Sequence, residues 1–164
     1  MPYLSWLEKA LAAKLAEQPI GTPVALRAYL QLTSDHGLLV AHAAGMTALA
    51  ERWFGANVAS IYSQGSAESG YLSLLVQFAA GQTALVVSEL VRPARDGAGE
   101  RPFTKLLVVG NHGTIEFEDA PGSDGLPVDV ASPDGPRERE ISREVERSLR
   151  SGQPAVAGAG RGFA

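Results

Sequence analysis

The sequence contains no cysteine, and this absence removes several kinds of chemistry from these 164 residues. Disulfide bonds, thiolate catalysis and cysteine-ligated zinc are all excluded. The sequence also lacks a basic excess, because 18 acidic and 14 basic side chains give a formal net charge of −4. A general nucleic-acid binder carries a basic surface, so we expect no nucleic-acid partner.

No long apolar run is present either. The longest uncharged stretch, residues 69–88, is interrupted by Gln77 and by the polar segment Gly81-Gln82-Thr83. A membrane-spanning helix needs about 20 mainly apolar residues, so we predict no membrane segment. The N-terminus carries Glu8 and has no basic region before an apolar stretch, unlike a signal peptide. We therefore expect a soluble, cytoplasmic protein.

Length and composition indicate a single folded domain. Hydrophobic residues make up 45% of the chain and charged residues 20%, which are ordinary values for a globular domain. We predict one domain over residues 1–156 and a loose, glycine-rich tail over residues 157–164.

Apolar residues recur at helical spacing in some segments and at every second position in others, which divides the chain into predicted helices and strands. Ser5, with Glu8 three residues later, is the predicted N-cap of the first helix. Short turns between the later strands require antiparallel pairing. We therefore predict an α+β fold, with an open, mainly antiparallel β-sheet and helices packed on one face. The predicted helices cover residues 5–18, 38–54 and 137–150, and the predicted strands cover 23–32, 57–63, 71–79, 82–91, 103–109 and 114–118.

The polar residues form no recognisable catalytic motif. Ser34, Asp35 and His36 are adjacent, so their side chains point in different directions and cannot form a triad. His36, His42 and a carboxylate offer the ligand types of zinc but not the spacing of a known zinc motif. The glycine-bearing segment 110–113 lies between two predicted strands, which favours a hairpin turn over a phosphate-binding loop. We predict no catalytic residue and no metal or cofactor site from the residues alone.

Several stretches carry a family resemblance through their order and spacing. They are Gln18–Val24 with the letters IGTPV, Gly37–Ser63 with RWFG before a strand, Gly70–Gly81, Leu106–Phe117 and the closing segment Glu146–Ala155. Together they resemble the C-terminal domain of the glucose–fructose oxidoreductase / inositol dehydrogenase / MocA family. The resemblance extends over nearly the whole chain.

This resemblance implies that cofactor binding and substrate contacts belong to two different domains. In that family an N-terminal Rossmann domain binds NAD or NADP, and the C-terminal domain contributes substrate contacts and packs sheet-to-sheet in oligomers. The sequence starts where the second domain would start, and neither the dinucleotide fingerprint nor the family's glutamate–lysine–proline motif is found in it. We therefore expect no cofactor to be bound by this chain itself.

The helix preceding RWFG departs from the family pattern. Family enzymes carry a D-x-x-x-H-x-x-D pattern there, and its three functional positions fall on Ala41, Gly45 and Ala48. None of these side chains can transfer a proton. His42 lies one helical turn before Gly45, on a similar face. We expect His42 to be a structural or vestigial cleft residue, with ligand binding as the alternative.

Three functional hypotheses follow from the resemblance and the departure. The first is a stand-alone, non-catalytic relative that forms a homo-oligomer through its open sheet face, with room for a small polar ligand. The alternative is one half of a split NAD(P)-dependent oxidoreductase that docks a separate Rossmann-domain protein. The third is a module that binds or senses a small molecule near His42, Tyr29 and Trp53, for which the family's substrates make a sugar or polyol the first candidate.

Overall fold

The computed structural model describes residues 2–17, 20–32, 38–66, 68–90, 103–119 and 135–156. The segment containing Ser34–His36 and the predicted tail, residues 157–164, lie outside these ranges. The helices are α1 (Pro2–Glu17), α2 (Leu38–Phe54) and α3 (Pro136–Ser151). The strands are β1 (Pro23–Leu32), β2 (Val58–Ser66), β3 (Tyr71–Phe78), β4 (Thr83–Leu90), β5 (Thr104–Gly110), β6 (Gly113–Asp119) and β7 (Ala155–Val156).

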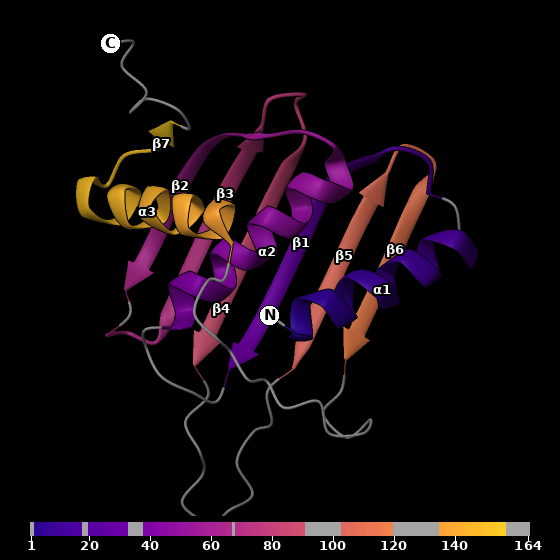
Figure 1. The fold of residues 1–164 in the computed structure, drawn as a ribbon, viewed down its shortest axis with the longest axis horizontal. Helices are drawn as coiled ribbons and strands as arrows, with labels where there is room; N and C mark the ends of the chain where they lie inside the picture. The colour runs from indigo at the N-terminus through magenta and orange to yellow at the C-terminus, as the bar shows by residue number, and fades with distance from the viewer. Residues whose placement is uncertain are drawn as a thin grey trace, which may run out of the picture.

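The seven strands form one open sheet in the order β6-β5-β1-β4-β3-β2-β7. The pair β1–β4 is parallel, and every other pair is antiparallel. All three helices lie on the same side of the sheet, with α1 over β5 and β6, and α3 over β2 (Figure 1). The predicted α+β fold with helices on one face is therefore confirmed.

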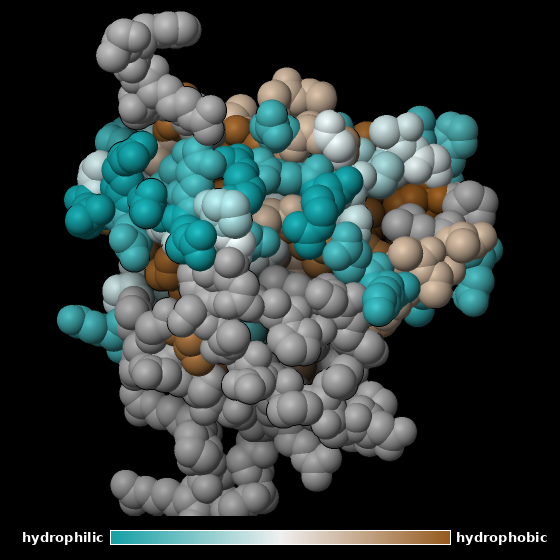
Figure 2. Space-filling view, in the orientation of Figure 1, coloured by the Kyte–Doolittle hydropathy of each residue, from teal (hydrophilic) through white to brown (hydrophobic). Residues whose placement is uncertain are grey.

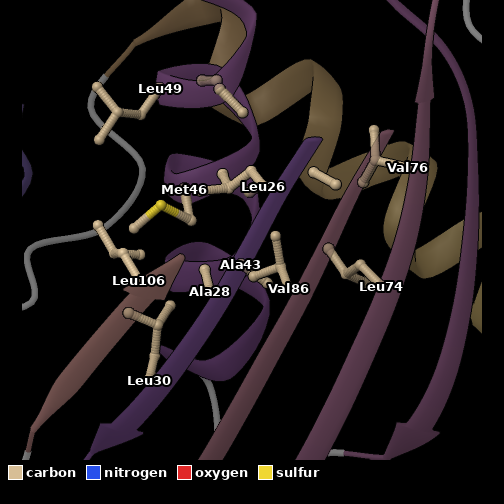
Figure 3. Packing of buried hydrophobic residues seen from close by; sticks show 14 of the residues in the cluster. Leu26, Ala28, Leu30, Ala43, Met46, Leu49, Leu74, Val76, Val86 and Leu106 are labelled. Atoms are coloured by element: carbon tan, nitrogen blue, oxygen red, sulfur yellow. The ribbon is translucent and has the colours of Figure 1, made fainter. Parts of the chain in front are cut away.

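The core lies between the sheet and helix α2. Alternate residues of the strands point toward this helix, because successive side chains of a strand point to opposite faces. In β1 these are Leu26, Ala28 and Leu30, and they face Ala43 and Met46 of α2 (Figure 3). The other residues of each strand, including Arg27 and Tyr29, therefore form the opposite face of the sheet, which we call the open face.

Helix α2 is the central helix of the packed layer. All ten residues from Ala41 to Ala50 are buried, and six of them are alanine or glycine, whose small size allows close packing around the helix. Helix α3 packs beside it through Ile141 and Val145, while hydrophilic residues cover its outward surface (Figure 2). Arg137 of α3 donates a 2.8 Å hydrogen bond from Nε to Glu51 at the end of α2.

The turn after β5 confirms one prediction from the sequence. Residues 110–113 join two antiparallel strands, as expected for a hairpin. Asn111 accepts a 2.9 Å hydrogen bond at Oδ1 from the backbone N–H of Thr22. His112 donates its backbone N–H to the carbonyl oxygen of Ile20 at 2.9 Å. The turn therefore fastens the segment that leads into β1.

None of the helices in the described part of the chain combines the length and apolar character needed to span a membrane.

Candidate functional site

Helix α2 carries the positions at which the family pattern requires acids and a histidine. Ala41, Gly45 and Ala48 occupy these positions, and all three are buried. Their side chains hold no titratable group. These three positions can therefore pack against neighbours but cannot donate or accept a proton.

His42 is the one histidine of α2, and it is buried with only 1% of its surface exposed. Neither Nδ1 nor Nε2 has a hydrogen-bond partner among the described residues. Burial lowers the pKa of His42 to about 4, because the charged imidazolium loses its hydration. The ring is therefore neutral at neutral pH. Within the described ranges, no group of three His, Cys, Asp or Glu side chains is placed to hold a metal ion.

The three predicted ligand-binding residues do not converge on one pocket. Tyr29 lies on the open face, whereas His42 is on the helical side of the sheet. Trp53 shares α2 with His42 but is eleven residues further on, which places it about 16 Å away along the helix axis. Trp53 is half-buried against the core. Tyr29 lines a hollow on the open face.

That hollow lies on the open face and has a volume of about 360 Å³. We call it the open-face hollow, and side chains of β1, β5 and β6, with Phe103 just before β5, form its walls. The strand pairing explains their convergence, because Leu107 is the partner of both Arg27 and Glu116. The residues are Arg27, Tyr29, Phe103, Lys105, Leu107 and Glu116.

The two cations of the open-face hollow, Lys105 and Arg27, differ in their ion pairs. Lys105 Nζ lies 3.6 Å from Glu116 and 3.4 Å from Glu118. The hydrogen bond to Glu118 is the main cause that raises the pKa of Lys105. Arg27 makes no ion pair with any described residue. Its guanidinium is therefore the cation of the hollow that still has its donors available.

Sequence reasoning identified Tyr29 but missed Arg27, Lys105 and Glu116. Arg27 stands two residues before Tyr29 in the alternating pattern of β1, which places both on one face. Alternation alone does not tell which strands lie beside β1. The hollow emerges only when β5 and β6 are placed next to it in their observed register.

Comparison with known proteins identifies the fold. No family model and no curated protein matches the sequence. Among solved structures, a probable dehydrogenase from Thermotoga maritima matches with a TM-score of 0.67 and 11% identity over 93% of this chain and 62% of that one. A scyllo-inositol dehydrogenase from Lactobacillus casei matches with a TM-score of 0.65 and 13% identity over 91% of this chain and 61% of that one. The chain has the fold of the C-terminal domain of the inositol dehydrogenase type of oxidoreductase.

A myo-inositol 2-dehydrogenase from Lactobacillus plantarum gives a similar result, with a TM-score of 0.64 and 13% identity over 90% of this chain and 60% of that one. The chain thus spans about three fifths of the length of these three proteins. These comparisons confirm the fold that the sequence resemblance implies. At such low sequence identities they support a shared fold and no shared function.

The hairpin turn at residues 110–113 differs from a dinucleotide-binding loop. The Lactobacillus casei structure was solved with bound NAD(H). A phosphate-binding loop of that kind leads from a strand into the N-terminus of a helix. The segment 110–113 leads from one strand into the next, so it does not have this geometry.

Proposed function

We propose that this chain is a non-catalytic assembly domain that pairs with a second copy of itself through the open face of its sheet. The observation that carries this proposal is a row of large apolar side chains running across neighbouring strands of that face. We call it the apolar row, and it consists of Tyr62 on β2, Leu75 on β3 and Leu85 on β4.

The strand register brings these side chains together. Leu75 is the direct partner of both Tyr62 and Leu85, so neighbouring Cβ atoms of the row lie about 5 Å apart. Leu75 is 48% exposed and Tyr62 is 39% exposed. Tyr71, 42% exposed, lies on the same face of β3. Contiguous exposed apolar groups of this kind favour burial in an interface.

Sheet-to-sheet pairing with a second copy would bury the apolar row. Two sheets packed face to face lie about 10 Å apart, with their side chains interdigitated. Most homodimers have a two-fold axis, so that the same surface of both copies forms the contact. Such an axis would bring the apolar row of one copy against the apolar row of the other. The helices already cover the other side of the sheet (Figure 1), so the open face is the side left for this contact.

The character of α2 supports a role without catalysis. Its buried stretch from Ala41 to Ala50 contains no carboxylate. Its histidine is neutral and has no acidic partner within reach of a hydrogen bond. General acid–base catalysis requires a titratable group held near the reacting atom. The helical face of this domain therefore serves packing.

Light scattering on purified protein tests the assembly. We expect a dimer or a larger oligomer at micromolar concentration. We expect the Leu75→Glu protein to be monomeric, because forming the interface would bury the new carboxylate without a partner. The matched control is Ala13→Glu, which adds the same charge at an exposed position of α1 on the helical side. A monomeric wild-type protein would refute the proposal, as would a Leu75→Glu protein that stays oligomeric.

A second candidate function is favoured by the fold comparison. The matching dehydrogenases contain about two fifths of their length beyond the part matched by this chain. The domain would then supply substrate contacts, for a sugar or polyol, to a Rossmann-domain protein that brings NAD(P). Co-purification of such a partner, with nicotinamide fluorescence in the complex, would favour this reading over self-assembly.

A further inference from the structure

We propose that the open-face hollow binds a small monocarboxylate that carries an apolar ring, with Arg27 holding the carboxylate. The hollow adjoins the apolar row on the open face, because Arg27 on β1 is the strand partner of Leu85 on β4. The residues that line the hollow come from β1, β5 and β6 and from Phe103, however, and none of them belongs to the row. The inference therefore goes beyond the proposed assembly and can be tested independently of it.

Arg27 supplies the recognition of the carboxylate. Its planar guanidinium presents paired N–H donors that match the two oxygens of a carboxylate. No described acid neutralises it. Leu107 lies between Arg27 and Glu116 in the register, so about 9.6 Å of sheet separates the strand of the cation from that of the carboxylate. Because no ion pair forms with a described residue, Arg27 is available to a ligand.

Two aromatic rings form the apolar wall. Tyr29 and Phe103 lie with their ring centroids 5.5 Å apart and their planes tilted by 47°. A flat apolar ring packs well against such a wall, because aromatic pairs favour offset or edge-on contacts. Leu107 adds an aliphatic surface beside Arg27. The ligand class therefore combines one anionic group with one ring.

The wall is held in place before any ligand arrives. Tyr29 donates its hydroxyl hydrogen to Glu89 on the neighbouring strand β4. Gln31 donates from Nε2 to the same hydroxyl oxygen at 3.2 Å. A fixed ring loses little freedom on binding, which lowers the entropic cost of association.

The surrounding acids favour a monoanion over a phosphate. Lys105 is shared between Glu116 and Glu118, so this group of three carries a net charge of −1. A dianionic phosphate would meet that negative charge with only one free guanidinium to compensate. A volume of about 360 Å³ is also near the lower end for ligand pockets, which suits a compact molecule.

Ligand-observed NMR and a thermal-shift titration with benzoate test the proposal. We expect benzoate to bind with a dissociation constant on the order of a millimolar, as the small size of the probe dictates. Benzamide, which has the same shape without the charge, should bind at least about tenfold more weakly. Phenyl phosphate should also bind more weakly than benzoate, because of the neighbouring acids.

Variants separate the roles of the side chains. Arg27→Gln should weaken benzoate at least about tenfold, and Arg27→Lys should restore part of the loss. The matched control is Arg52→Gln, which removes an exposed arginine at the end of α2 and should leave binding unchanged. Far-UV circular dichroism confirms that each variant folds.

Several outcomes would overturn the proposal. They are no benzoate binding at tens of millimolar, equal affinity for benzamide, tighter binding of phenyl phosphate, or wild-type affinity in Arg27→Gln. Binding in the Leu75→Glu protein, with its oligomer lost, is the result expected if assembly and ligand binding are separate. Failure of assembly with benzoate binding intact would refute the proposed function alone.

Discussion

The buried imidazole of His42 makes a quantitative prediction about acid stability. Its pKa falls from the ordinary 6.5 to about 4 because burial removes its hydration. At pH values between these two pKa values, the imidazole of His42 is protonated in the unfolded chain and neutral in the folded protein. The free energy of unfolding therefore falls as the pH falls through this window.

The magnitude follows from the size of the shift. Between about pH 7.5 and pH 5, the linkage relation gives a loss of about 2 kcal/mol from His42. Glu144 acts in the opposite direction, because burial raises the pKa of its carboxyl group and stabilises the fold as the pH falls. Comparing a His42 variant with the wild type cancels the Glu144 contribution, which both proteins share.

Urea denaturation followed by circular dichroism at the two pH values is the assay. We expect His42→Leu to lose about 2 kcal/mol less than the wild type between about pH 7.5 and pH 5. His42→Gln keeps a polar side chain at the site but cannot titrate, so it should show the same reduced pH dependence. If both variants lose as much stability as the wild type, the imidazole is protonated in the folded protein and the reasoning fails.

Further predictions concern packing and the backbone, and urea denaturation of the variants checks each of them. Glu51→Gln weakens the ion pair with Arg137 that joins α2 to α3, and we expect a loss of about 1–3 kcal/mol; no loss would show that the pair is solvated. Gly110→Ala would place a Cβ 2.2 Å from the carbonyl oxygen of Ile20, and the clash should cost about 1–3 kcal/mol. Gly55→Ala meets no atom within 4 Å but sits at φ +62°, so only backbone strain of about 1 kcal/mol is expected. Equal losses at the two glycines would contradict this distinction.

Local periodicity was sufficient to predict most of the secondary structure. Each of the six predicted strands is present, because one buried face imposes a period of two on the sequence. The prediction of Ser5 as the N-cap of α1 is wrong, since the helix begins at Pro2, and proline is favoured in the first helical turn. Strand β7 was missed because two residues, Ala155 and Val156, are too few to show a period.

The candidate site was harder to predict, because most of its residues are far apart in the sequence. Tyr29 was proposed as a ligand contact, but apart from Arg27 its partners in the hollow lie more than seventy residues later in the chain. Pairing of β1 with β5 and β4 depends on the whole sheet and leaves no local signal. The placement of His42 and Tyr29 on opposite sides of the sheet, by contrast, follows from the alternation of β1, which turns Tyr29 away from the core face.

The position of β1 also bears on the order in which the protein folds. The strand lies between β4 and β5 and is the element that connects the antiparallel group β2-β3-β4 to the hairpin β5-β6 within the described sheet. Both groups pair locally and can form early, whereas β1 must find partners about sixty and eighty residues away. Contacts this distant slow folding. Among the strands of this sheet, β1 is thus made first and inserted last, and until it is inserted, two separate sheets expose the edges that it will join.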